Sequence, residues 1–456
     1  MTTAPARHSP ASVTPAASAT HPFDLRAGEL LESLHASGQY KHLRMLESPM
    51  DAVVRIRGYG DCLCFCSNNY LGLANHPEVI EAGIKGLRDF GAGTASVRFI
   101  CGTFSPHEVL EARIAELMGT EASYTFVSAW TANEAVFPTL AEPGDTIISD
   151  ELNHACIIDS IRLAAVIKKG VNKTVYKHND LASLHAKLEE TAAANRDRPG
   201  TGAKAPVTWV VTDGVFSMEG DIADLPALRR LCDQYNAVLV VDDSHGTGVM
   251  GARARGTHEH WHMIDAPSGD GWGQAAGTAH RPPHDGATAH HHADNHSKGR
   301  VDLFTGTLGK ALGGGAGGYV AGSKKAIDLL IQRGRPTLFS NALPVTVACS
   351  ATKAIEILMR EPQRAAKLRE NVAYARAQIK SAGFNVIDSP TAICPIIVHD
   401  TAKAIAMSKR LLELGVFVIG FGYPVVPEGH ARLRVQISAA HEKQHIDGLV
   451  AALKKL

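Results

Sequence analysis

The chain has 456 residues, 45% of them hydrophobic and 20% charged, which is typical of a globular protein large enough for more than one domain. Basic and acidic residues are equal at 46 each, so net charge favours neither nucleic acid nor an anionic membrane as a partner. No apolar run reaches the length of a membrane span. The eight cysteines show no paired metal spacing, and we expect a reducing, cytoplasmic setting.

The chain begins with a segment, residues 1–22, that is rich in Ala, Ser, Thr and Pro and contains no acidic residue. Such a composition buries too little surface to fold, so we predict a disordered tail. An organelle-targeting peptide is the weaker alternative, because the segment holds a single Arg. Residues 23–65 follow as an N-terminal segment, in which Cys62, Cys64 and Cys66 alternate. On a strand these thiols share one face, as small buried residues do.

From residue 66 to 343, helical and strand patterns alternate, which predicts a large α/β domain with a mostly parallel sheet. Continuous β-branched runs indicate strands that are covered on both faces, and apolar residues three and four apart indicate helices. The predicted strands are residues 124–127, 146–149, 207–212 and 237–241, and the predicted helices are residues 106–118 and 180–190.

One segment of this domain, residues 262–299, is rich in Gly, Ala, Pro and His and has no periodicity. We interpret it as a solvated insertion loop; metal binding is the alternative, through His284, His290, His291, His292 and His296. Past residue 343, a long helical pattern and the strand-like runs ICPIIV and GVFVIGF predict a smaller C-terminal α+β domain over residues 344–456.

Polar residues with chemical potential follow several strands. Asp242 and His245 come directly after the apolar strand 237–241, and ligands of open α/β sheets collect at such strand ends. Taken alone, Asp242 is more often a helix cap or an ion-pair partner. Lys310 is surrounded by glycines that leave room for a flat ligand. The Gly-rich run at residues 313–318 comes after the lysine, which is the wrong order for a P-loop.

Three further strand ends complete the pattern. His154 follows strand 146–149, and its ring could lie on a planar ligand, although a lone histidine there is usually structural. Ala129 and Trp130 open a helix, whose first N–H groups suit a phosphate. Ser217 lies just past strand 207–212. Together these residues suit one flat, anionic ligand that bears an aldehyde.

Long motifs in this order resemble the α-oxoamine synthases, a group of fold-type I enzymes that use pyridoxal 5'-phosphate (PLP). The similar stretches are NNYLGLANHPEV, VRFICGT, ISDELNHACIID, TDGVFSMEG, VDDSHGTG, TGTLGKALGG, RPTLFSN and FGYPVVPEGHARLRVQISAAH. The resemblance covers about residue 24 to the C-terminus, apart from the insertion. It implies a seven-stranded, mostly parallel sheet, and a homodimer with shared active sites.

The resemblance also implies roles at matching positions. Lys310 would carry PLP as a Schiff base, and Asp242 would pair with the pyridine nitrogen. The other implied contacts to the cofactor come from His245 near the ring hydroxyl, His154 stacked on the ring, Ser217 beside the hydroxyl, and a phosphate seat of Ala129, Trp130, Thr307 and Ser340, the last reached from the partner subunit. Asn68 and Arg434 would bind the substrate, Arg434 by clamping its carboxylate.

The implied reaction interconverts 2-amino-3-ketobutyrate and CoA with glycine and acetyl-CoA, as in threonine degradation. The reaction passes through a carbanion at the α-carbon of the amino acid, and the protonated pyridine ring of PLP would absorb its negative charge. An acid about 4 Å from the ring nitrogen would contribute about 4 kcal/mol to keeping that nitrogen protonated. Catalysis would fall to Lys310, His154, Asp242 and His245. Two departures stand out: Ala129 with Trp130 replaces a Cys-aromatic pair, and the insertion has no counterpart.

Two alternatives remain open on the sequence. The first is another condensing enzyme of the same group, which forms 8-amino-7-oxononanoate, 5-aminolevulinate or a sphingoid base. The second is a protein without catalysis, either a PLP-type fold with an inactive site or a His-rich metal binder; the presence of Lys310, Asp242 and His154 argues against it. Neither a nucleic-acid nor a membrane partner is expected, and no metal is assigned.

Overall fold

A computed structural model describes residues 21–196, 202–264, 300–423 and 425–456, and divides the chain at residue 45 into two units. The first unit contains the helix α1 (Pro22–Ala36), which begins after His21; the His21 Nδ1 accepts a hydrogen bond from Phe23 N at 3.1 Å. None of its residues is buried. The predicted disordered tail lies outside the described residues, except for its last two.

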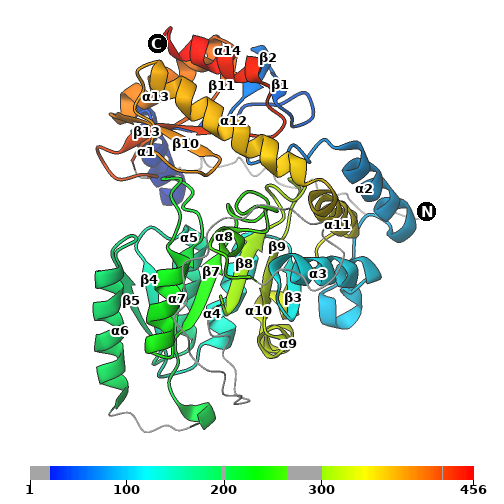
Figure 1. Ribbon diagram of the computed structural model, residues 1–456, viewed down its shortest axis with the longest axis vertical. Coiled ribbons are helices and arrows are strands. Elements are labelled where there is room, and N and C mark those ends of the chain that lie inside the picture. The colour runs from blue at the N-terminus through cyan, green and yellow to red at the C-terminus, as the bar shows by residue number, and fades with distance from the viewer. Residues whose placement is uncertain (1–20, 197–201, 265–299, 424) are drawn as a thin grey trace, which may run out of the picture. The chain divides into compact units, whose positions relative to one another are not determined.

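The second unit contains a seven-stranded sheet in the order β3-β9-β8-β7-β6-β4-β5, drawn through the middle of Figure 1. All neighbours pair in parallel except β9, which is antiparallel to both β3 and β8. The strands are β3 (Ala122–Phe126), β4 (Thr146–Asp150), β5 (Asn172–Tyr176), β6 (Thr208–Asp213), β7 (Val238–Asp242), β8 (Leu303–Thr307) and β9 (Gly318–Gly322). The predicted seven-stranded, mostly parallel sheet is confirmed.

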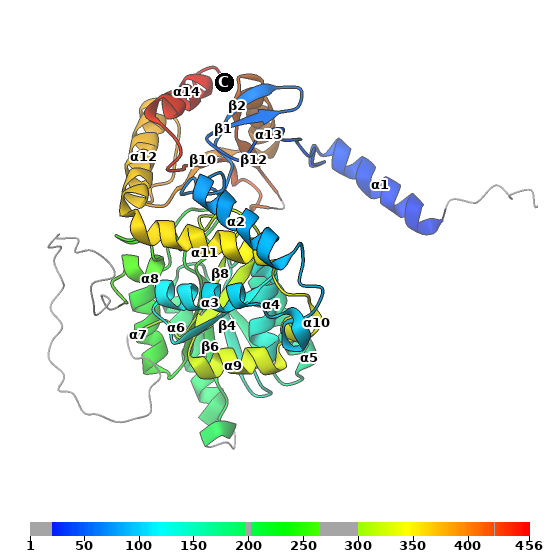
Figure 2. The same cartoon turned by 90° about the vertical axis from the view of Figure 1, so that its right-hand side faces the viewer.

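Helices cover both faces of this sheet, as the two views in Figures 1 and 2 show. Successive strand residues enter different cores: Val210 packs in the larger core with α3, α6 and α7, and Val211 packs in the other with α4, α5 and α9. Burial on both faces explains why the central strands are continuous apolar runs. The helices are α2 (Pro77–Phe90), α3 (Ser105–Met118), α4 (Ala129–Leu140), α5 (Ala155–Ile167), α6 (Leu181–Arg196), α7 (Leu225–Gln234), α8 (Thr257–His260), α9 (Lys324–Arg333), α10 (Arg335–Phe339) and α11 (Val345–Arg360).

Two small sheets join segments from far apart in the sequence. The first has the order β1-β2-β11 and the second β10-β13-β12. Their strands are β1 (Val53–Ile56), β2 (Gly60–Cys64), β10 (Ile393–His399), β11 (Val416–Phe417), β12 (Ile419–Phe421) and β13 (Ala431–Gln436), flanked by α12 (Pro362–Ser381), α13 (Thr401–Glu413) and α14 (Lys443–Leu453). The N-terminal segment therefore shares a sheet with the C-terminal region through β2 and β11, and the predicted domain boundaries stay a prediction.

The small core of the first sheet explains the alternating cysteines. Cys62 and Cys64 are buried together with Val54 and Ile56, and Cys66 is partly buried against them. The interpretation as small buried residues on one face of a strand holds for Cys62 and Cys64, whereas Cys66 lies two residues beyond the end of β2.

The other local predictions need small changes at element ends. Strand 207–212 begins one residue later and runs to Asp213, and the helix predicted over 180–190 continues to Arg196. The run GVFVIGF forms two short strands, β11 and β12, in different sheets. The His-rich insertion lies outside the described residues from 265 onward. Among the residues that the structure describes, no helix combines the length and the apolar character needed to cross a bilayer.

Candidate active site

Asp242 ends the central strand β7, and its side chain points to the face that α4 covers. Asn133 of α4 and Thr305 of β8 both donate hydrogen bonds to its Oδ2, at 2.6 and 2.7 Å, and Ser244 N donates to its Oδ1 at 3.0 Å. Burial by itself would raise the pKa of Asp242, but these hydrogen bonds and the nearby Lys310 hold that pKa below its ordinary value. The site therefore contains a buried, ionised carboxylate.

Lys310 lies in the loop after β8, close enough to Asp242 for their charges to interact. Its Nζ is 2.9 Å from His245 Nε2. Burial lowers the pKa of the Lys310 amine to about 8, and the lowering is opposed by the charge of Asp242 and reinforced by that of Arg434. The carboxylate and the amine therefore act on one another across a single site. A lysine with a pKa near neutrality offers a free amine as a nucleophile.

His154 is the residue that precedes α5, and its ring is held on one side. Its Nδ1 accepts a hydrogen bond from Cys156 N at 3.2 Å and lies 2.9 Å from Cys156 Sγ. The ring of Trp130 stands edge-on to it, with 6.3 Å between ring centroids. Desolvation lowers the pKa of His154, Asp242 opposes that change, and Lys310 adds to it, so the ring faces the same site as a neutral imidazole.

Two residues of the predicted phosphate seat, Ala129 and Trp130, lie at the start of α4. Ser128 caps the helix by accepting from Thr131 N at 3.1 Å, which leaves the N–H groups of Ala129 and Trp130 ahead of the first intrahelical bond. Gly318 of β9 permits this placement, because a Cβ there would lie 2.4 Å from the backbone of Ala129. Thr307 ends β8, where its Oγ1 accepts from Gly309 N at 3.0 Å in the loop that leads to Lys310.

Arg434 of β13 places a buried positive charge in the site, and part of its hydrogen-bonding capacity is unused by the residues that the structure describes. The side chain is buried, with 8% of the residue exposed. Its Nε and Nη2 have no hydrogen-bond partner in the described structure. Its charge acts on Lys310, His245 and Tyr70. A buried guanidinium with free donors fits a carboxylate that arrives with a ligand.

The remaining predicted residues are placed as follows. Asn68 accepts a hydrogen bond from Gln436 Nε2 at 2.5 Å and connects to the group around Tyr70. Ser217 is half-buried in the loop after β6, which Arg432 holds by donating to Met218 O. Ser340 follows α10 and lines a small cavity with Thr131 of its own chain. Its predicted reach into a partner's site stays a prediction.

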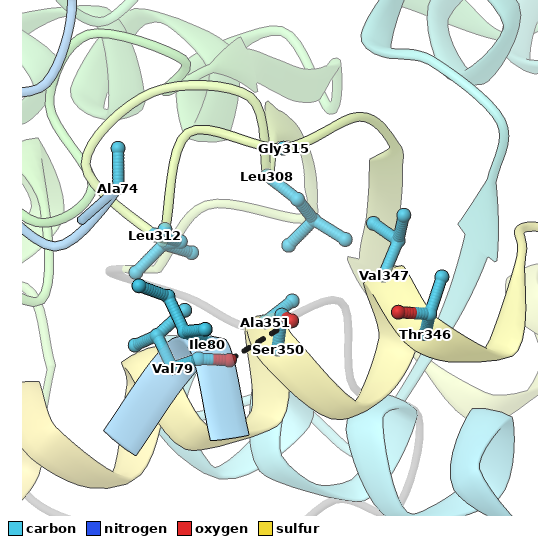
Figure 3. A pocket seen from close by; sticks show the side chains of 11 residues that line it. Ala74, Val79, Ile80, Leu308, Leu312, Gly315, Thr346, Val347, Ser350 and Ala351 are labelled. Atoms are coloured by element: carbon cyan, nitrogen blue, oxygen red, sulfur yellow. Dashed lines mark hydrogen bonds between the residues drawn. The ribbon is translucent and has the colours of Figure 1, made fainter. Parts of the chain in front are cut away.

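The loop that carries Lys310 borders a cavity of about 150 Å³ above α2 and α11 (Figure 3). Leu308 and Leu312 of the loop face Val79, Ile80 and Ala351 of the helices. The two helices are joined by side-chain hydroxyls, as Ser350 Oγ donates to Val79 O at 3.1 Å. Most of the side chains that line the cavity are apolar, and Lys310 is not among them.

Sequence reasoning missed several residues that the structure adds. Asn133 and Thr305 fix Asp242, Tyr70 contacts His245, and Gln436 contacts Tyr70. Asp213 is buried beside the site: its Oδ2 accepts from His154 N at 3.2 Å, and its Oδ1 has no partner in the described structure. Only its position before the predicted Ser217 turn could have indicated Asp213. The other four residues depend on contacts between distant segments.

These groups fit the predicted cofactor. An amine with a lowered pKa suits an aldehyde, a buried carboxylate suits a protonated pyridine nitrogen, and the start of α4 suits a phosphate. The orphaned oxygen of Asp213 and the free donors of Arg434 show that the site is built for polar ligands that the protein does not itself supply. The predicted role of each residue stays a proposal.

Comparisons with known proteins agree with this fold and site. The model of the aminotransferase class I and II family matches residues 60–453. The chain is 40% identical over 425 residues to the mitochondrial 2-amino-3-ketobutyrate coenzyme A ligase of Bos taurus, covering 93% of this chain and 90% of that protein. The corresponding ligase of Escherichia coli K12 is 38% identical over 93% of this chain and 95% of its own length.

Other relatives extend the set. An 8-amino-7-oxononanoate synthase of Alkaliphilus oremlandii is 39% identical over 94% of this chain and 95% of its own length. The structure of a Sphingomonas wittichii serine palmitoyltransferase matches with a TM-score of 0.79 at 26% identity, covering 95% of this chain and 96% of that one. The chain therefore belongs to the aminotransferase class I and II family. Within it, the chain is a member of the α-oxoamine synthase group, and the predicted resemblance is confirmed.

Proposed function

We propose that this chain is a PLP-dependent acyltransferase that interconverts 2-amino-3-ketobutyrate and CoA with glycine and acetyl-CoA. The predicted activity agrees with the names of relatives from Bos taurus and Escherichia coli, and the predicted cofactor agrees with serine palmitoyltransferase structures that contain PLP. The observation that carries the proposal is the set formed by the Lys310 amine, the Asp242 carboxylate and the uncommitted Arg434 in one site.

Bound PLP would supply an electron sink for the negative charge that forms at the α-carbon of the amino acid. Lys310 would hold the cofactor through its aldehyde, Asp242 would keep the ring nitrogen charged, and the first N–H groups of α4 would bind the phosphate. His154 would lie against the ring and keep water from it. These assignments follow from the chemistry of the groups that are present.

The protein's own residues would then direct the reaction. Arg434 binds the carboxylate of the amino acid by two parallel hydrogen bonds, which fixes the bond at the α-carbon that breaks. Lys310, once its amine is free, accepts a proton from the α-carbon of glycine or returns one to it. A pKa of about 8 suits that exchange, because both forms of the amine are populated near neutral pH.

The proposal includes a homodimer with shared active sites, because Ser340 is predicted to reach the partner's phosphate seat. The large exposed side chain of Phe339, 73% of it accessible in the single chain, stands beside Ser340 and would be covered in such an assembly. The cytoplasmic location stays a prediction, since the Bos taurus relative is mitochondrial.

The test is turnover by the purified protein. Free CoA released from glycine and acetyl-CoA is followed with a thiol reagent, and Lys310→Ala is the control that should release none. We expect glycine with acetyl-CoA to be the best pair. Activity restricted to L-alanine, L-serine or succinyl-CoA would transfer the assignment to another member of the group. The 8-amino-7-oxononanoate synthases, at 39% identity, make the L-alanine reaction the second candidate.

A further inference from the structure

A chain of hydrogen bonds continues from Lys310 into the protein. Lys310 Nζ lies 2.9 Å from His245 Nε2, and His245 Nδ1 lies 2.8 Å from the hydroxyl of Tyr70. Gln436 donates to that hydroxyl through its Nε2 at 3.0 Å. Tyr70 and Gln436 are almost fully buried, with 1% and 2% of each residue exposed. They come from opposite ends of the sequence.

The direction of each bond follows from the proton count. The amide nitrogen of Gln436 has two protons, and it gives one to Tyr70 and one to Asn68 Oδ1, at 2.5 Å. Tyr70 then has its single proton left to donate. The Nδ1 of His245 at 2.8 Å is a far stronger acceptor position than Asn68 Oδ1 at 3.4 Å.

These bond directions determine which nitrogen of His245 carries the proton and whether Lys310 is protonated. A neutral imidazole carries one proton, so an Nδ1 that accepts from Tyr70 leaves the proton on Nε2. That N–H points at the Lys310 nitrogen. An ammonium has three donors and no acceptor, whereas a neutral amine has a lone pair to receive the bond.

We propose that Tyr70 and Gln436 are positioning residues that fix the proton of His245 on Nε2 and thereby hold Lys310 as a neutral amine. The inference rests on the proposed function, because the free amine is the form that binds an aldehyde and accepts a proton. It adds two residues of the protein interior to those that determine the reactivity of Lys310.

Other charged and titratable groups face Lys310, and they do not by themselves decide its state. Asp242 and Asp213 favour the ammonium, as does the thiol of Cys156, while burial and Arg434 favour the amine. The pKa of His245 is lowered first by burial and also by Arg434, with Lys310 and His154 adding to this only in their protonated forms, which keeps the imidazole neutral. Because these influences on Lys310 oppose one another, the direction of the hydrogen bond from His245 decides whether Lys310 is protonated.

The test measures the protonation of Lys310 in the absence of substrate. The full chain is freed of cofactor, and the rate at which trinitrobenzenesulfonate modifies Lys310 is followed by peptide mass spectrometry across the pH range. The wild-type midpoint is expected near the pKa of about 8. Tyr70→Phe should move that midpoint up by about 1 pH unit, a roughly tenfold slower modification at neutral pH. Gln436→Met should move it in the same direction by less.

The matched control is Tyr319→Phe. It removes another buried tyrosine hydroxyl, bonded to Thr247 Oγ1 at 3.0 Å, and should leave the midpoint unchanged. A midpoint that stays in place in both Tyr70→Phe and Gln436→Met would overturn the proposal. If Tyr70→Phe does not fold, Gln436→Met and the wild-type measurement below carry the test.

A second measurement observes the imidazole directly. Nitrogen NMR of the ¹⁵N-histidine-labelled protein, with the His245 signal assigned by His245→Gln, should show the proton on Nε2 in wild type and a mixture of both forms in Tyr70→Phe. A proton on Nδ1 in the wild type would reverse the Tyr70–His245 and His245–Lys310 bonds and refute the inference. Both readouts need neither substrate nor turnover, so failure of the glycine and acetyl-CoA assay would reject the proposed function separately.

Discussion

Asp242 and Arg434 are the two buried charges of opposite sign at the site, and they are prepared in opposite ways. Asp242 has 5% of its surface exposed and receives three hydrogen bonds from its surroundings. Arg434 has 8% exposed, and two of its nitrogens have no partner in the described structure. Both lie at strand ends or in strands, but only the acid is fully satisfied by the protein.

The difference indicates what each charge is for. A carboxylate that its neighbours already stabilise keeps its charge whether or not a ligand is present, as a permanent partner for a cofactor must. A buried cation without partners is costly on its own, and that cost is relieved when a carboxylate binds. This difference supports the proposal that Asp242 serves the cofactor in the resting site and that Arg434 binds the substrate carboxylate.

The largest effect is expected for Asp242→Asn, which tests whether the charge of the acid is required. The amide keeps the shape and some hydrogen bonds but removes the charge, so we expect turnover to fall by about a thousandfold, or about 4 kcal/mol in the barrier. The assay is CoA release from glycine and acetyl-CoA, with circular dichroism to confirm the fold. Retention of more than a tenth of the wild-type rate would show that the charge is not required.

Arg434→Lys tests the positive charge and its proposed binding of the substrate carboxylate. Lysine keeps a positive charge but loses the planar fork, so we expect kcat/KM for glycine to fall by about a hundredfold, mainly through KM. The KM for acetyl-CoA serves as the internal control and should change little. An equal rise of both KM values would instead mean that the substitution disturbs the whole site.

Asn133→Ala tests whether the hydrogen bonds to Asp242 hold its pKa low. The variant removes one of two bonds to Oδ2, so the pKa of Asp242 should rise and the acidic limb of the activity profile should move to higher pH. We expect about a tenfold loss of activity at neutral pH, consistent with one unmade bond to a buried charge. Thr305→Val, which removes the other bond to the same atom, should behave alike. An unchanged limb in both variants would contradict the role given to these bonds.

The smallest effect on turnover is expected for His178→Gln, which removes a charge that the protein has already paired. Burial by itself would lower the pKa of His178, but hydrogen bonds to Asp150 and Asp221 raise it to about 10, above the ordinary 6.5. The pair therefore stabilises the fold fully below pH about 6.5, and this contribution is lost as pH rises through about 10.

We accordingly expect His178→Gln to lower the free energy of unfolding by about 3 kcal/mol near pH 6 and by little near pH 10. Turnover at neutral pH should stay within about threefold of wild type, because His178 contacts neither the amine nor the guanidinium. Urea unfolding at the two pH values is the measurement. A loss of stability that is the same at both would exclude the charged pair.

Much of the architecture was predictable from local patterns. The runs around Ile147, Val210 and Leu239 are apolar without interruption because both faces of a central strand are buried. Asp242 and His154 follow such runs, so their gathering at one edge of the sheet could be expected from the strand-end rule. The motifs also identified the family, because each is long and they occur in a fixed order.

What the sequence determined by itself is therefore the strand pattern, the family and the residues placed by short-range rules. The tertiary structure alone decided the environment of those residues. Asn133 reaches Asp242 across 109 positions, and Gln436 reaches Tyr70 across 366. Hydrogen bonds of this kind depend on which segments pack together, and no local periodicity encodes them. In our proposal, the direction of the bonds from Gln436 through Tyr70 to His245 in turn sets the protonation of Lys310.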